Sequence, residues 1–70
     1  MTRPEKLLAV FREILEAGSE YMGISKQILA DAFAKKFHGE PTATNRELVD
    51  AFLAASDRGW IEVIDVPGKG

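Results

Sequence analysis

Three runs of apolar residues at helical spacing, separated by glycine and proline, most constrain how this chain can fold. The first run follows Thr2, a helix-capping residue, and ends at Gly18, which tolerates the left-handed backbone of a helix end. The second follows Ser25, another capping residue, and the third follows Thr44, which is spaced to form a capping box with Glu47. The pattern predicts three amphipathic helices.

The apolar faces of these helices supply the predicted core, because residues that recur every three or four positions share one side of a helix. The expected core residues are Leu7, Phe11, Ile14, Ile28, Phe33, Phe37, Leu48, Phe52 and Trp60. We expect Leu29 and Leu53 to face inward as well. A chain of 70 residues buries only a modest core, so we expect a single domain over 1–70.

Two segments outside the helices have the composition of strands. The segment EYMGI, residues 20–24, precedes the second helix, and WIEVIDV, residues 60–66, follows the third helix and Gly59. Backbone donors and acceptors of a strand need partners, and each segment is available to the other. The expected fold is therefore mainly α with a two-stranded antiparallel β ribbon packed on three helices.

This order of elements resembles the winged helix-turn-helix superfamily, and the sequence ELVDAFLAASDRGWIEVIDVPGKG, residues 47–70, carries most of the resemblance. In that family a recognition helix is followed by a glycine, a strand that enters the wing and a glycine-rich wing tip. The sequence departs from the pattern because no second wing strand follows PGKG and because the connection between the second and third helices is long. The resemblance implies that the start of the third helix enters the major groove of DNA.

A set of polar and cationic side chains is predicted to contact nucleic acid. Asn and Arg suit base edges, while Lys neutralises phosphates. The set is Lys35, Lys36, Thr42, Thr44, Asn45, Arg46 and Lys69. The structural alternative is that Thr44 only caps its helix, that Arg46 pairs with Asp50 one turn later, and that the lysines are solvated. The net charge of −2 disfavours strong non-specific binding to polyanions.

The alternative function is protein binding, as by a small regulator or inhibitor that holds a partner through the third helix or through the open edge of the last strand. The last predicted strand is apolar on both faces, and such strands are usually covered on both sides. Trp60, Ile61 and Val63 are therefore a candidate interface with a protein partner or with a second copy of the chain in a homodimer. The opposing interpretation is that one face covers the helices and the other residues are scattered exposed hydrophobics.

Catalysis, cofactor binding and metal binding are not expected. His38 is the only histidine, and protein metal sites usually take three or four ligands. The PGKG sequence lacks the Ser or Thr that follows the lysine of a phosphate-binding loop. The absence of cysteine fits a reducing compartment such as the cytoplasm, and no apolar run reaches membrane-spanning length, so we expect no membrane partner.

Overall fold

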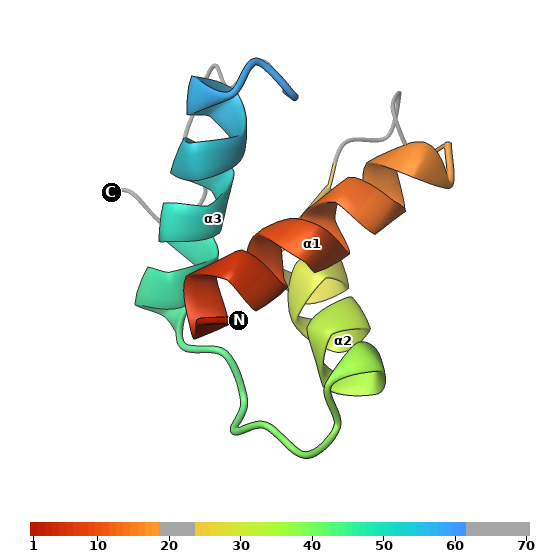
Figure 1. The fold of residues 1–70 in the computed structure, drawn as a ribbon, viewed down its shortest axis with the longest axis vertical. Coiled ribbons are helices and arrows are strands. Elements are labelled where there is room, and N and C mark those ends of the chain that lie inside the picture. The colour runs from red at the N-terminus through yellow and green to blue at the C-terminus, as the bar shows by residue number, and fades with distance from the viewer. Residues whose placement is uncertain (19–23, 62–70) are drawn as a thin grey trace.

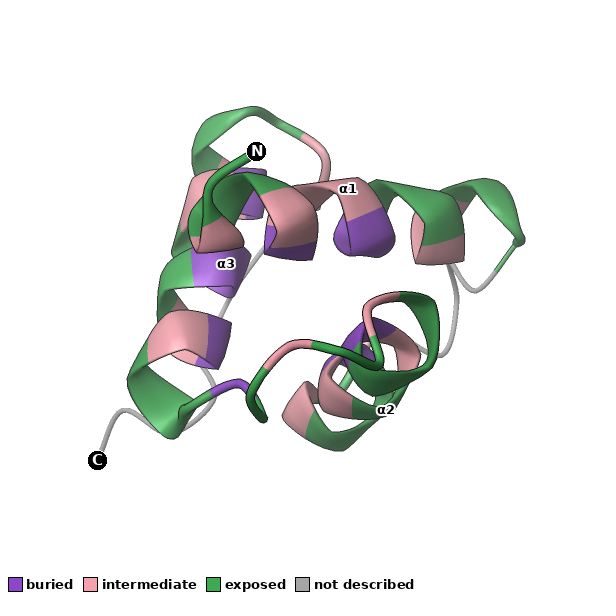
Figure 2. Cartoon of the chain, turned by 60° about the horizontal axis from the view of Figure 1, so that its bottom comes forward, coloured by how far each residue is buried: buried purple, intermediate pink, exposed green. Residues whose placement is uncertain are grey.

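The computed structural model describes residues 1–18 and 24–61, which contain three α-helices (Figure 1). Helix α1 spans Arg3–Glu16, α2 spans Lys26–Lys36 and α3 spans Asn45–Asp57. Helix α1 packs against both of the others. The buried residues lie on the sides of the helices that face one another (Figure 2). In the described part of the chain, no helix combines the length and apolar character needed to cross a membrane.

Each helix begins at the cap residue that the sequence predicts. Thr2 and Thr44 each form a full capping box, in which the threonine hydroxyl accepts from the backbone N–H of Glu5 or Glu47. The two glutamates in turn accept from the backbone N–H of their cap residue, at 2.7 and 2.9 Å. The Ser25 side chain caps α2 through a single bond of the same kind. These contacts satisfy backbone donors that have no partner within the helix.

The predicted β ribbon is wrong, because the described residues form three helices and no strand. Of the last predicted strand, Trp60 and Ile61 are described, and they form a bend. Of the first predicted strand only Ile24 is described, and it is not in a strand either. The rest of both segments, 20–23 and 62–66, lies outside the described residues. The fold is therefore mainly helical.

The turn that ends α3 explains why a strand does not begin at Trp60. Gly59 has a φ of 76°, and its N–H donates to the Ser56 carbonyl at 3.0 Å. The N–H of Trp60 donates to the Ala55 carbonyl at 3.0 Å. Together these bonds make a Schellman turn, which closes the helix and occupies the first N–H that a strand would use for pairing.

The core lies where the three helices meet and is entirely apolar among the described residues. Phe11 of α1 and Phe52 of α3 pack edge to face, with ring centroids 5.1 Å apart. The buried residues are Leu7, Val10, Phe11, Leu29, Phe33, Ala43, Leu48, Ala51, Phe52 and Ala55. Burial of these side chains is the main source of stability in a domain of this size.

Most of the predicted core is confirmed, but two positions are wrong. Ile14, Phe37 and Trp60 are partly buried at its edge. Ile28 is 47% exposed and Leu53 is 45% exposed. Neighbouring residues on a helix point about 100° apart, and here Leu29 and Phe52 point into the core while the adjacent Ile28 and Leu53 lie towards solvent.

Replacing Phe52 with Ala should lower the free energy of unfolding by about 3–5 kcal/mol, because the ring is 3% exposed and leaves a cavity against Phe11. Leu53→Ala at the adjacent position is the matched control, and it should cost less than about 1 kcal/mol because that residue is already 45% exposed. Urea denaturation measures both. Equal losses in the two variants would contradict the core described here.

Candidate nucleic-acid interface

The starts of α2 and α3 lie beside each other. Lys26 is the first residue of α2 and Asn45 is the first residue of α3, and the Lys26 ammonium donates to Oδ1 of Asn45 at 2.6 Å. The amino end of a helix carries a partial positive charge. The Lys26 ammonium thus lies at the amino ends of both helices, and it adds positive charge beside an α3 end that Thr44 and Glu47 already cap.

Arg46 extends from this corner into solvent. Its side chain is 85% exposed, and its Nε lies 3.4 Å from Oδ2 of Asp50 one turn along α3. The structure thus contains the pairing that the sequence offered as an alternative to ligand binding. An exposed pair of this kind contributes only about 0.3–0.5 kcal/mol, so the Arg46 guanidinium can exchange Asp50 for a ligand at little cost.

The two threonines near this corner already have structural contacts. The hydroxyl of Thr44 accepts from the backbone of Glu47 at 3.1 Å, so its capping role is confirmed. The carbonyl of Thr42 accepts from Nη2 of Arg3 at 3.5 Å. Both threonines are exposed, and their contact with nucleic acid stays a prediction.

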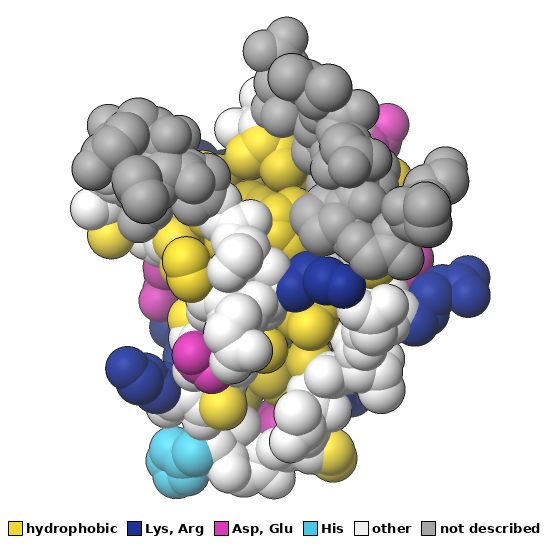
Figure 3. Space-filling view, turned by 180° about the vertical axis from the view of Figure 1, so that it is seen from behind, with side chains coloured by type: hydrophobic (Ala, Val, Ile, Leu, Met, Phe, Trp, Pro, Cys, Tyr) yellow, Lys and Arg dark blue, Asp and Glu magenta, His cyan; other side chains and the backbone are white. Residues whose placement is uncertain are grey.

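The predicted lysines at the end of α2 are not brought to this corner. Lys35 and Lys36 lie about 15 Å from Lys26 along the helix axis, at a rise of 1.5 Å per residue. The Lys36 ammonium donates to the carboxylate of Glu13 on α1. On the face of the molecule opposite that of Figure 1, the cationic side chains are spread apart (Figure 3). Lys69 lies outside the described residues.

The predicted interface residues at the end of α3 pack against the core. Trp60 and Ile61 are both partly buried. The guanidinium carbons of Arg12 and Arg58 lie 5.4 and 5.9 Å from the centroid of the Trp60 ring, so each arginine makes a cation–π contact with it. Val63 lies outside the described residues, so its part in an interface stays a prediction.

An ionic network that the sequence did not reveal holds the start of α3 in place. Nε and Nη2 of Arg3 donate to the two carboxylate oxygens of Glu47, at 2.8 and 2.9 Å. Nη1 of Arg3 donates to Glu40 at 3.1 Å, and Lys6 donates to the other oxygen of Glu40 at 2.9 Å. The first turn of α1 is thereby tied both to the connection before α3 and to the α3 capping box.

This network favours the ionised form of its carboxylates. The hydrogen bond from Arg3, followed by the one from the backbone of Thr44, lowers the pKa of Glu47 to about 2. The hydrogen bond from Lys6, followed by that from Arg3, lowers the pKa of Glu40. Protonation of either group would weaken the attachment of α1 to the start of α3.

Lys26 is the residue of this corner that sequence reasoning missed, because its position on the second helix predicts only a solvated side chain. Its place immediately after the Ser25 cap shows that it lies at a helix start. Only the packing of α2 and α3 on α1 brings the starts of these two helices together.

No metal-binding cluster of three or more His, Cys, Asp or Glu side chains occurs within 1–18 and 24–61. Compared with known proteins, the chain matches no protein-family model, no curated protein and no solved structure. The resemblance to winged helix-turn-helix proteins therefore stays an expectation from the sequence pattern.

Replacing Thr44 with Ala should lower the free energy of unfolding by about 1 kcal/mol through loss of the α3 cap. Thermal and urea denaturation measure the change, and DNA binding should persist wherever the variant is folded. If DNA binding were lost while stability held, Thr44 would be a ligand contact instead of a cap.

Replacing Glu47 with Gln should destabilise the fold by about 1 kcal/mol or more at neutral pH, because the charge-assisted bonds with Arg3 are weakened. The pKa of Glu47 is lower in the folded state, so its contribution is present above pH 4.5 and is lost as the pH falls through about 2. Denaturation across this pH range should show wild type and variant converging in acid. Glu16→Gln, which removes an exposed pair with Arg12, should change little at any pH.

Proposed function

We propose that this protein is a small non-enzymatic binding module that binds duplex DNA through the start of α3. The observation that carries the proposal is the contact between Lys26 and Asn45, which places the starts of α2 and α3 side by side next to the exposed Arg46. Regulation of transcription is the role that the winged-helix resemblance implies for such a module.

In the proposed complex, the start of α2 and Lys26 face backbone phosphates while Asn45 and Arg46 approach base edges. This division matches helix-turn-helix docking, in which the recognition helix presents its first residues to the major groove and the preceding helix meets the backbone. Lys35 and Lys36, a helix length away, would contact phosphates further along the duplex. Phosphate contacts position the protein, and base contacts give specificity.

The charge of the protein limits how strong this binding can be. Asp50 lies on the exposed side of α3 close to Arg46, and the whole chain has a net charge of −2. Carboxylates near phosphates are repelled, so the affinity for DNA should be modest and should fall steeply with salt.

The proposal requires no cofactor or metal. It places the protein in the cytoplasm, because a chain without cysteine suits a reducing compartment.

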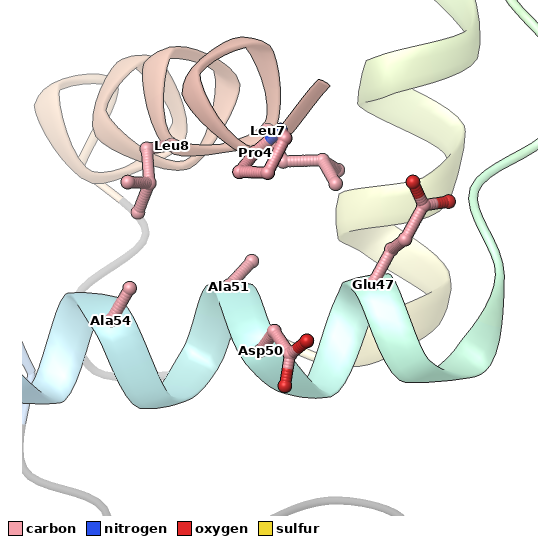
Figure 4. Close-up of a pocket in the computed structure, with 7 residues that line it drawn as sticks. All are labelled: Pro4, Leu7, Leu8, Glu47, Asp50, Ala51 and Ala54. Atoms are coloured by element: carbon pink, nitrogen blue, oxygen red, sulfur yellow. The ribbon is translucent and has the colours of Figure 1, made fainter. Parts of the chain in front are cut away.

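Protein binding is the second candidate, and a groove between α1 and α3 favours it. The groove has a volume of about 70 Å³, and Leu8 of α1 and Ala54 of α3 face each other across it (Figure 4). Its lining residues are Pro4, Leu7, Leu8, Glu47, Asp50, Ala51 and Ala54. The alanines of α3 leave space for one apolar side chain of a partner. A second copy of the chain is one such partner, and sedimentation over a range of concentrations detects it.

Binding of the wild-type protein to a labelled random-sequence duplex, followed by fluorescence anisotropy at low and moderate salt, tests the DNA proposal. We expect binding that weakens as salt rises. The Lys26→Ala variant should bind more weakly and should reduce the slope of log affinity against log salt by about 1, because one phosphate contact is lost.

Arg12→Ala is the control for charge alone. Arg12 lies against Trp60, which follows the far end of α3 about 20 Å along the axis from Asn45. This variant loses one positive charge but should keep the salt slope of wild type. No binding even at low salt would reject the DNA proposal and favour the protein-binding candidate. Equal slopes for the two variants would remove Lys26 from the interface.

A further inference from the structure

We propose that Lys26 gives the start of α3 a preference for guanine over adenine, by holding the Asn45 amide in one orientation. The inference rests on the proposed DNA-binding function and deepens it. It concerns the chemistry of one corner, formed by Lys26, Asn45 and Arg46, and it makes Lys26 a specificity-determining residue.

The orientation of the Asn45 amide follows from the chemistry of its partner. A lysine ammonium can only donate hydrogen bonds, so the atom it contacts at 2.6 Å must be the carbonyl oxygen of the amide. The amide nitrogen of Asn45 is then directed away from Lys26. Asn45 is exposed, so this nitrogen has its two donors available to a ligand.

Recognition of adenine needs both ends of an asparagine side chain. The amide nitrogen donates to N7 of adenine, and the amide oxygen accepts from the N6 amino group. In this structure the Asn45 oxygen already accepts a hydrogen bond from the Lys26 ammonium, which takes up one side of that oxygen. An amide oxygen can accept two hydrogen bonds, but a second donor there would lie next to the positive charge of the ammonium, so Lys26 disfavours adenine.

Guanine presents the opposite pattern. Its major-groove edge has two acceptors, O6 and N7, and no donor. With its oxygen held by Lys26, Asn45 offers its amide nitrogen as a donor, and Arg46, whose side chain is 85% exposed, offers its guanidinium. These donors fit the two acceptors of guanine, and the exposed contact between Arg46 and Asp50 is weak enough to be exchanged for it.

Selection from a duplex library with a randomised centre tests this inference without knowledge of the target site. The protein is mixed with the library at low salt, and the bound duplexes are separated and sequenced. Wild type should enrich guanine over adenine by about fivefold or more at one central position, which is the low end of the discrimination that one good side-chain contact provides. In Lys26→Met, which keeps the length of the side chain and removes its charge, the ratio should fall to within about twofold or reverse.

Arg12→Met is the matched control, because it removes one charge from an exposed arginine that lies against Trp60. This variant should keep the same preference for guanine over adenine as the wild type. Circular dichroism verifies that both variants are folded, since Lys26 and Arg12 contribute nothing to the buried core.

The possible outcomes distinguish a failure of this inference from a failure of the proposed function. If Lys26→Met binds more weakly but keeps the guanine preference, Lys26 is only a phosphate contact and the inference is wrong while the DNA proposal stands. If wild type binds in a salt-dependent manner with no base preference, the inference is wrong as well. If no variant retains any duplex at low salt, the proposed function is rejected and the inference with it.

Discussion

The packing of α1 against both other helices is the constraint on which the rest of the structure depends. Phe11 of α1 is fully buried and meets Phe52 of α3 edge to face, while Leu7 and Val10 on the same side of α1 are buried with it. Loss of a buried aromatic ring costs about 3–5 kcal/mol, which is a large fraction of the stability of a small domain. Surface ion pairs contribute about 0–1 kcal/mol each and cannot substitute for this core.

The ionic network adds orientation to this packing. The Glu47 carboxylate accepts hydrogen bonds both from the backbone N–H of Thr44 and from the Arg3 guanidinium, so it joins the start of α1 to the start of α3. Its neighbours on α3 are the residues that carry the proposed function. Asn45 and Arg46 therefore extend from a helix turn whose backbone is capped and whose position relative to α1 is held by charge-assisted bonds.

The same arrangement changes which cations are relevant to the proposed binding of DNA. Sequence neighbours suggested that Lys35 and Lys36 act together with Asn45 and Arg46, because they end the helix that precedes them. The structure instead brings Lys26 to Asn45, because the two helices have their starts side by side. The end of α2 lies against α1, where the Lys36 ammonium meets Glu13. The proposed interface is therefore smaller than expected, and its one direct contact, between Lys26 and Asn45, is the basis of the proposed preference for guanine.

Local signals in the sequence determined the three helices and their ends. Capping side chains bond to backbone atoms only three residues away, and Gly18 and Gly59 adopt the positive φ that closes a helix, so short-range chemistry was sufficient to predict them. The apolar spacing also identified most of the core. It failed at Ile28 and Leu53, because the rotation of a helix about its axis depends on what it packs against.

Tertiary structure alone decided the contacts between residues distant in the chain. The pairing of Arg3 with Glu47 and of Lys26 with Asn45 joins separate helices, and no spacing along the sequence encodes either distance. The β ribbon was predicted from composition, yet the N–H of Trp60 is taken by the turn that ends α3. The sequence thus determined which helices form, and their packing on α1 decided which side chains meet, since that packing is set by the shapes of all three apolar faces together.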